Sequence, residues 1–239
     1  MAEKLVRDSI IPISRCDFDG VLGIPETFSL FMDLATEHAC SIDLGIGTLG
    51  KKGLFWLAVR TRIKFFRRPK IEEKVTLSTW PQKPFRMRND RSYLISKDDE
   101  HLVEGKTEWA VLDTETNKLI RAEQIYPEGL IFEEAVFSDP FERVRDTFEE
   151  ADKFAEYTIR STDIDLGGHM NNSAYLRALF SSLSREDRKS AEISEIDVRF
   201  VTPSYEGETL SLYRRTNENK TEYAMKTQDG ATVLLVSVW

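Results

Sequence analysis

Apolar side chains follow two different periods along this chain, and each period occurs in both halves. In residues 173–183 they recur at every third or fourth position, which predicts an amphipathic helix. The positions are Leu176, Leu179, Phe180 and Leu183. A second stripe with this spacing lies earlier, at Phe31, Leu34, Ala35 and His38. One short helix is therefore expected in each half.

After each predicted helix, the period falls to two. Apolar residues alternate with charged ones over residues 59–65 and again over residues 196–200, as in strands with one buried face. Residues 97–100 and 228–230 each combine turn-forming residues between two apolar runs, which indicates hairpin connections. Each half therefore reads as one helix followed by a meander of antiparallel strands.

Three segments recur in the same order without gaps, which indicates an internal duplication. Residues 16–34 match 162–180, residues 62–77 match 197–212, and residues 91–109 match 221–239. The landmark pairs are Asp17 with Asp163, Asp19 with Asp165, Phe65 with Phe200, Glu73 with Glu208, Tyr93 with Tyr223, and Trp109 with Trp239. The predicted class is α+β, with an antiparallel sheet wrapped around a helix in each unit.

The expected division is a first unit at residues 1–120, an acidic linker at 121–157, and a second unit at 158–239. The linker is rich in glutamate and aspartate and has little periodicity. It is too long for a tight turn, so it is expected to cross a surface or to contribute a helix around residues 141–154.

Composition narrows the class of function. The chain has 239 residues, 33 Lys and Arg against 41 Asp and Glu, and a net charge of −8, which disfavours a nucleic-acid partner. No apolar run approaches the roughly 20 residues of a membrane span, and the charged N-terminus is unlike a secretory signal. With two cysteines and no clustered ligands, neither a disulfide framework nor a metal site is expected, and a cytoplasmic location fits best.

The most unusual stretch runs from residue 160 to residue 179. Two aspartates, two glycines, a histidine and two asparagines stand directly before the second helix, where unpaired backbone N–H groups attract negative charge. Such a place can stabilise an oxyanion. The alternative is that an asparagine only caps the helix and His169 is a packed polar residue. A cap needs one polar residue, whereas this stretch has six polar groups when Ser173 is included, so we favour the functional interpretation.

The ungapped match places Gly23 opposite His169, and Pro25 with Glu26 opposite the two asparagines. The first half has therefore lost the polar set, and one active site per chain is expected. No glycine-rich phosphate loop is present, since the segment at Gly45 lacks the lysine of such a loop, and no cofactor is expected.

These residues resemble the acyl-acyl-carrier-protein thioesterases, which are tandem hotdog-fold enzymes. The resemblance covers most of the chain, and its most specific part is Asp165-x-x-x-His169-x-Asn171-Asn172-x-x-Tyr175. Supporting matches are residues 32–39, Trp56, Arg67-Arg68-Pro69, Thr79-Trp80-Pro81, and Glu108-Trp109 with Asp113.

The resemblance implies hydrolysis of fatty acyl-acyl carrier protein, with Asp165 and His169 as catalytic residues and Asn171 and Asn172 in support. Two positions differ from the family pattern: Gly167 stands where asparagine is common, and Pro203 where glutamate is common. Either Asp165 and His169 suffice, or Glu206 or Glu208 reaches the site by a shifted loop, or the chain is slow or only binds. We favour the first alternative.

A mechanism with these residues places the oxyanion on the N–H groups of Asn172 and Ser173, with a further hydrogen bond from His169. Asp165 is then either a general base or a nucleophile, and the sequence does not choose between these roles.

The resemblance also implies an acyl-chain slot in the first unit. Candidate lining residues are Phe28, Phe31, Met32, Leu34, Phe55 and Trp56, each of which could equally be ordinary core. A cationic strand could dock the acidic acyl carrier protein, although a solvated strand face explains it equally well. Its residues are Arg60, Arg62, Lys64, Arg67 and Arg68.

Two other functions remain open: a 3-hydroxyacyl dehydratase, and a non-catalytic acyl-binding protein. The expected oligomeric state is a monomer or a homodimer, since two fused units already supply the pair that single-unit relatives form.

Overall fold

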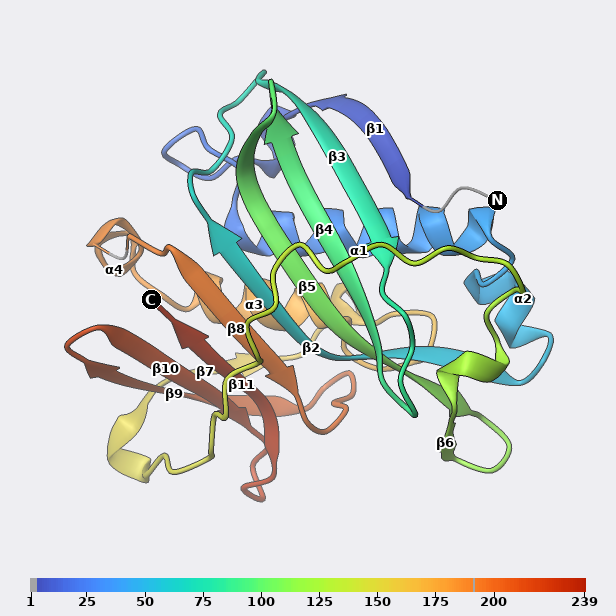
Figure 1. Cartoon of the computed structure of the whole chain (residues 1–239). Coiled ribbons are helices and arrows are strands. Elements are labelled where there is room, and N and C mark those ends of the chain that lie inside the picture. Colours follow the sequence, from blue (N-terminus) through green and yellow to red (C-terminus); the bar gives the residue numbers. More distant parts are fainter. Residues whose placement is uncertain (1–3, 191) are drawn as a thin grey trace. The chain divides into compact units, whose positions relative to one another are not determined.

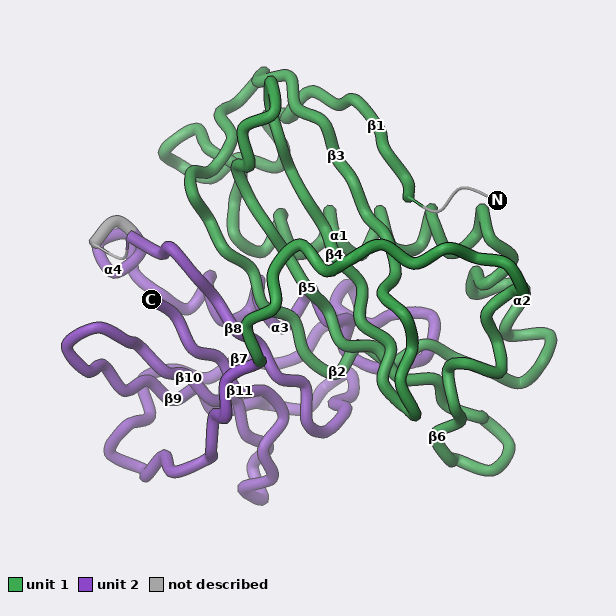
Figure 2. Tube along the Cα trace, viewed as in Figure 1, with its two compact units in different colours: residues 1–140 green, residues 141–239 purple. Residues whose placement is uncertain are grey.

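The computed structural model describes residues 4–190 and 192–239 of the chain. The chain divides between Pro140 and Phe141 into two compact units, unit 1 and unit 2 (Figure 2). Residues 121–157, expected to form a linker, are thus shared between the two units. Each unit is built around one antiparallel sheet.

Unit 1 places its strands in the order β1-β3-β4-β5-β2, with β6 paired to β5. The strands are β1 (Leu5–Ile10), β2 (Leu54–Phe65), β3 (Lys74–Pro81), β4 (Asn89–Lys97), β5 (Glu100–Asp113) and β6 (Lys118–Ile120). The helices are α1 (Ile24–Ser41) and the short α2 (Ile46–Gly50), with 3-10 turns η1 (Ile13–Arg15) and η2 (Ala122–Gln124).

Helix α1 lies across one face of this sheet (Figure 1). The predicted apolar stripe is the buried side of α1. The helix begins after Gly23 and has Pro25 in its first turn. Phe31 is fully buried and stacks on Tyr93 at 4.6 Å between ring centroids. Its ring lies on Gly105, where an added Cβ would stand 2.3 Å from Phe31 Cε2. Glycine at this point lets the helix and the sheet approach closely.

Unit 2 repeats the arrangement, and its strand order, given from the equivalent edge, is β7-β9-β10-β11-β8. Its strands are β7 (Lys153–Thr158), β8 (Glu195–Phe200), β9 (Thr209–Asn217), β10 (Lys220–Lys226) and β11 (Thr232–Val238). The helices are α3 (Asn172–Ser181) and α4 (Arg185–Ser190), with 3-10 turns η3 (Glu150–Asp152) and η4 (Ser161–Asp163). Equivalent strands have the same order in both sheets, as the predicted duplication requires.

The register of the first sequence match is wrong by two residues. The backbone of Asp17 donates to the carbonyl of Val21 at 2.9 Å, and Asp165 donates to His169 at 2.9 Å in the same way. Asp17 is therefore the counterpart of Asp165, which the sequence match had paired with Asp19. The gapless match slipped because each loop carries two aspartates that are two residues apart, Asp17 and Asp19 in one and Asp163 and Asp165 in the other. The helices that follow, α1 and α3, begin at the same distance from Asp17 and Asp165.

The second match is correct, and the third is correct only as far as the hairpin. Lys70 N–H donates to Glu73 at 2.8 Å, and Tyr205 N–H donates to Glu208 at 3.1 Å in the matching turn. In the third match, the pairing across the second hairpin is displaced by one residue, since Ile95 pairs with Val103 whereas Met225 pairs with Leu234. Phe65 lies opposite Val103, whereas Phe200 lies opposite Leu234. Trp109 and Trp239 are consequently not equivalent.

Residues 121–140 form an extended strap over the unit 1 sheet (Figure 1). The strap crosses successive strands, and each strand supplies a hydrogen bond to it. Trp80 on β3 donates to the Glu134 carbonyl at 2.7 Å, Ser92 on β4 accepts from the Val136 N–H at 3.0 Å, and Lys106 on β5 donates to the Asp139 carbonyl at 2.7 Å. Side chains of the sheet thus satisfy backbone groups that have no ladder of their own.

The helix expected around residues 141–154 does not form, and only the 3-10 turn η3 lies there. Val144 and Phe148 pack on Tyr213, Ala224 and Leu235 from the unit 2 sheet. Carboxylates accept hydrogen bonds from backbone N–H groups of this segment. The Glu142 N–H donates to Asp197 at 2.8 Å, and the Glu149 N–H donates to Asp152 at 2.9 Å. The extended segment buries Val144 and Phe148 as a helix would. The unit 2 sheet provides the residues against which they pack.

Candidate functional site

The loop before α3, residues 161–171, is held in shape by its own backbone, and we call it the unit 2 loop. Ile164 and Met170 form an isolated β-bridge. Gly168 has a φ of 77°, a backbone conformation that glycine adopts without strain. Asn171 N–H donates to the Asp163 carbonyl at 2.8 Å. Met170 N–H donates to the Ser204 carbonyl at 2.8 Å, which ties the loop to the connection between β8 and β9.

The Asp165 carboxylate is oriented by two backbone donors of the same loop. Its Oδ1 accepts from Gly167 N–H at 2.7 Å and, more weakly, from His169 N–H at 3.4 Å. No ion pair of Asp165 occurs within residues 4–190 and 192–239, and the residue is partly buried. A positioned carboxylate without a cationic partner can act as a base or as a nucleophile.

His169 lies on the same loop, so the two predicted catalytic residues are brought together. Its carbonyl accepts from Asp165 N–H, and its ring is 5.2 Å from the Tyr205 ring at an angle of 57°. The imidazole is partly buried. A carboxylate and an imidazole therefore stand beside the start of α3.

Asn171 caps α3, as the alternative interpretation of this stretch held. Its Oδ1 accepts from Ser173 N–H at 2.9 Å and from the Ser173 hydroxyl at 2.6 Å. The Ser173 amide, expected to bind an oxyanion, is thus already engaged. The N–H of Asn172 makes no hydrogen bond within the described residues. Of the two amides expected to serve an oxyanion, only that of Asn172 is available.

The remaining predicted residues of unit 2 have other surroundings. Gly167 is exposed and contributes only the backbone donor to Asp165. Glu206 is exposed on the turn between β8 and β9. Glu208, the other carboxylate considered, caps this turn through Tyr205 N–H.

Two residues to which the sequence assigned no role belong to the same place. Tyr175 is 3% exposed and Ser204 is fully buried, and neither hydroxyl has a hydrogen-bond partner among the residues that the structure describes. Burial raises the pKa of Tyr175. Tyr175 stood in the family pattern, but only its buried position on α3 could have singled it out. Nothing in the sequence marks Ser204.

Unit 1 contains a loop with the same backbone, residues 13–23, which we call the unit 1 loop. Asp19 N–H donates to Asp17 Oδ1 at 3.0 Å, and Gly20 has a φ of 73°. Here the aspartate is neutralised, because Arg68 forms an ion pair with Asp17, whose side chain is 7% exposed. Val21 stands in the place of His169. The sequence match had placed Gly23 opposite His169. In the structure, the two loops differ instead at Val21 and in the ion pair of Asp17.

The expected acyl-chain residues occupy two kinds of environment in unit 1. Phe28 and Phe31 are fully buried in the core, as is Leu34. Met32, Phe55 and Trp56 are partly buried. Trp56 packs against a cluster of Ala39, Ile42, Leu44, Leu49 and Leu130, and its indole donates to the Leu44 carbonyl at 3.0 Å.

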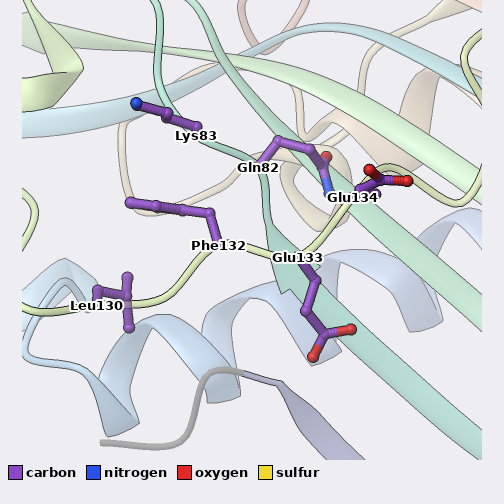
Figure 3. Close-up of a pocket in the computed structure, with 6 residues that line it drawn as sticks. All are labelled: Gln82, Lys83, Leu130, Phe132, Glu133 and Glu134. Atoms are coloured by element: carbon purple, nitrogen blue, oxygen red, sulfur yellow. The ribbon is translucent and has the colours of Figure 1, made fainter.

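An open groove of about 630 Å³ lies at the border of this cluster (Figure 3). Leu130 and Phe132 of the strap form its apolar part, and both also pack in the cluster around Trp56. Its polar lining is Gln82, Lys83, Glu133 and Glu134. The groove shares none of the expected acyl-chain residues.

The cations expected to dock a carrier are largely engaged within unit 1. Lys64 pairs with Asp139 at 2.8 Å, and Arg67 pairs with Glu73 at 2.8 Å. Arg68 pairs with Asp17, and Arg62 donates to the Pro140 carbonyl. Arg60 is partly buried, with a side-chain nitrogen that lacks a partner.

Searches of the described residues found no cluster of three or more histidine, cysteine or acidic side chains fit for a metal ion. Among the same residues, no helix has the length and apolar character to cross a membrane.

Two family models match the chain. The model described as the acyl-ACP thioesterase N-terminal domain matches residues 3–128, and the C-terminal domain of the same family matches residues 147–237. Among curated relatives, oleoyl-acyl carrier protein thioesterase 1 of Arabidopsis thaliana, a chloroplastic protein, is 22% identical over 191 residues. The match covers 72% of this chain and 53% of the relative, so the chain spans about half the length of the curated relatives it matches.

Solved structures give the same result for the fold. An acyl-ACP thioesterase from Bacteroides thetaiotaomicron superimposes with a TM-score of 0.87 and 23% identity, covering 100% of this chain and 99% of that one. The 12:0-ACP thioesterase from Umbellularia californica gives a TM-score of 0.88 with 17% identity, covering 100% and 97%. The predicted α+β fold of two tandem hotdog units is confirmed.

Proposed function

Because the chain belongs to the acyl-ACP thioesterase family, whose two domain models together match most of it, we propose that it hydrolyses fatty acyl-acyl carrier protein. The products are the free fatty acid and the carrier thiol. The observation that carries this proposal is the Asp165 carboxylate, held by two N–H groups of its own loop, beside His169 and the first turn of α3.

Thioester hydrolysis requires a polarised carbonyl, a nucleophile and an exit for the thiolate. We assign the developing oxyanion to the Asn172 N–H, with a second hydrogen bond from the His169 ring. Asp165 takes the proton of the attacking water, or attacks the carbonyl itself to give an anhydride that water cleaves. A thiolate is a weak base, so no strong general acid is needed at the leaving group.

The support provided by other residues differs from the first expectation. Asn171 acts by fixing the first turn of α3, because its carboxamide is engaged with Ser173. Gly167 contributes a backbone donor alone. Position 167 tolerates a side chain, since its unit 1 counterpart is Asp19 with the same hydrogen bond. A side-chain role for Glu206 stays a prediction.

Unit 1 is proposed to hold the acyl chain, as the family resemblance implies. Met32, Phe55 and Trp56 are the residues to vary, because they are only partly buried. Changing Phe28 or Phe31 would chiefly remove core packing, at a cost of about 3–5 kcal/mol for phenylalanine to alanine. A change of chain-length preference in variants of Met32 would support the assignment.

Docking of an acidic carrier on Arg60, Arg62 and Lys64 is a further proposal. Reversing all three charges should raise KM for carrier-bound substrate about 10-fold and spare short pantetheine esters, since electrostatic complementarity mainly speeds encounter. Lys64 also pairs with Asp139, so the variant's melting temperature must be measured as a control. Equal effects on both substrates would refute docking at these residues.

The direct test of the function is thiol release from a panel of acyl-carrier and acyl-CoA esters, from octanoyl to octadecanoyl. Release of thiol with the free acid as product supports hydrolysis. Loss of water from a 3-hydroxyacyl substrate, with the thioester intact, would instead identify a dehydratase. Binding of acyl chains without turnover would identify an acyl-binding protein. The cytoplasmic location and the choice between monomer and homodimer stay predictions.

A further inference from the structure

Among the described residues of unit 2, three buried hydroxyls lack the partners that buried polar groups almost always have: Tyr175, Ser204 and, on β11, Ser237. The first two share one neighbourhood. Tyr175 is 3% exposed, Ser204 is fully buried, and neither hydroxyl makes a hydrogen bond within the described residues. A buried polar group left unsatisfied costs about 1–3 kcal/mol. Such a pair indicates a place that a small polar molecule completes.

Both hydroxyls lie next to the unit 2 loop. Tyr175 stands one turn into α3, three residues after Asn172, and its ring is 6.0 Å from that of Phe200 at the end of β8. The Ser204 carbonyl accepts from Met170 N–H, the residue after His169. The backbone of the loop thus fixes Ser204 at the same end of the helix as Tyr175.

The charges of two carboxylates act on the Tyr175 phenol. Burial is the main cause of the raised pKa of Tyr175, and the charges of Glu208 and Asp165 raise it further. Ser204 lies close enough to the phenol to oppose this shift, although the two hydroxyls fall short of hydrogen-bond geometry. The surroundings of the two hydroxyls therefore combine hydrogen-bond donors with negatively charged acceptors.

The fold does not require this pair. In unit 1, the backbone hydrogen bond equivalent to that of Met170 and Ser204 joins Leu22 to Pro69, at 2.8 Å. Thr27 takes the place of Tyr175 and satisfies its own hydroxyl by donating to the Gly23 carbonyl at 2.8 Å. The same loop thus forms in unit 1 with a proline and a self-satisfied threonine, so the loop does not need the unsatisfied hydroxyls of Tyr175 and Ser204 for its shape.

We propose that Tyr175 and Ser204 are positioning residues that hold the hydrolytic water next to Asp165. This inference rests on the proposed function and assigns Asp165 the role of general base. A water molecule accepts from one of the two hydroxyls and donates to Asp165 and to the other hydroxyl, which leaves one lone pair on its oxygen for attack. Its oxygen forms the new bond to the thioester carbon, one proton passes to Asp165, the carbon–sulfur bond breaks, and the thiolate takes up that proton.

The test compares Tyr175→Phe, Ser204→Ala and the double variant. Each single change should lower kcat by about 10- to 100-fold, the range for loss of one well-placed hydrogen-bonding group, with KM within about 2-fold. Because both changes disturb one water, the double variant should be little worse than either single one. Ser204→Thr, which keeps a hydroxyl, should recover most of the rate lost in Ser204→Ala.

The matched control is Tyr223→Phe, the same chemical change at a buried tyrosine of β10. It should leave kcat unchanged, and the melting temperature of every variant should stay within about 3 °C of the parent. If Tyr175→Phe does not fold, the comparison of Ser204→Ala with Ser204→Thr decides.

Single variants at the parental rate would overturn the inference, as would losses that multiply in the double variant or that follow a lower melting temperature. An unmodified protein that releases no thiol from any acyl ester fails differently, because it refutes the proposed function itself.

Discussion

The unit 1 loop and the unit 2 loop have one backbone and two opposite chemistries. Asp17 and Asp165 each accept a hydrogen bond from the N–H two residues on, and a glycine with positive φ follows in both. In unit 1 the carboxylate is buried against Arg68. In unit 2, Pro203 takes the place of Arg68, and the carboxylate has only neutral donors. The difference shows that one loop geometry occurs with two settings of the aspartate, one paired with a cation and one without such a pair among the described residues.

The residues around each aspartate follow the same division. His169, Asn171 and Asn172 are replaced in unit 1 by Val21, Gly23 and Ile24, and α1 begins there without a side-chain cap. The aspartate of the unit 1 loop is thus satisfied within the fold, as expected for a structural turn. The unit 2 loop retains groups whose partners are not supplied by the fold, which is where chemistry is expected.

The largest effect should come from exchanging one aspartate at a time. Asp165→Asn keeps an oxygen for the Gly167 N–H and removes the base, so kcat should fall about 10³-fold or more while the melting temperature stays unchanged. Asp17→Asn should do the reverse: activity is kept, and the free energy of unfolding falls by about 1–3 kcal/mol because Arg68 loses its partner. Thiol release and urea unfolding measure both. Equal loss of activity in the two variants would contradict the comparison.

His169→Val gives the unit 2 loop the residue of the unit 1 loop. The backbone bond from Asp165 N–H to residue 169 does not depend on the side chain, so the loop should keep its shape. Loss of one oxyanion donor should lower kcat about 10²-fold. A variant with the parental rate would remove His169 from the mechanism, and a large drop in melting temperature would show a structural role.

The main helix of each unit, the hairpins and the duplication could be predicted because they depend on local period and turn chemistry. The expectation of one short helix in each half was wrong in two respects, because α1 has 18 residues and because α2 and α4 also form. The stripes around Phe31 and Leu176 and the turn at Asp98 and Asp99 are all present where expected. The strap and the segment at residues 141–150 could not be predicted. Their extended path is set by partners from the sheet, such as Trp80 and Asp197, that are distant in sequence.

The candidate site was predictable in its residues but not in their surroundings. The run from Asp165 to Asn172 is visible as an excess of polar groups before a helix. The ion pair of Asp17 with Arg68 depends on residues far apart in the sequence, and a gapless match misaligned the first of them. The buried hydroxyl of Ser204 has no local signature, because burial there is decided by tertiary packing.

A smaller effect should follow from giving unit 2 the cation of unit 1. Pro203→Arg places a guanidinium where Arg68 stands relative to its aspartate. An opposite charge nearby favours the ionised carboxylate and weakens it as a base, so kcat should fall about 10-fold. Pro203→Gln is the matched control, since it removes the proline without adding charge, and it should retain most of the rate. If both variants lose activity equally, the proline itself matters and the charge does not.

The smallest effect concerns the turns directly before β3 and β9, where Glu73 and Glu208 each accept a hydrogen bond from a backbone N–H. Glu73 also accepts hydrogen bonds from Arg67 and Lys97. The hydrogen bonds from Arg67, and then those from the Lys70 N–H and Lys97, lower the pKa of Glu73 from 4.5 to about 2, although burial acts in the opposite direction. A lowered pKa means that the ionised group stabilises the fold above pH 4.5 and that this contribution disappears as pH falls toward 2. Glu73→Gln should therefore lower the free energy of unfolding by about 1–2 kcal/mol at neutral pH, and Glu208→Gln by less. In urea titrations repeated at successively lower pH, the gap between Glu73→Gln and the parent should close below pH 4.5, whereas a gap independent of pH would show that charge is not what distinguishes the two turns.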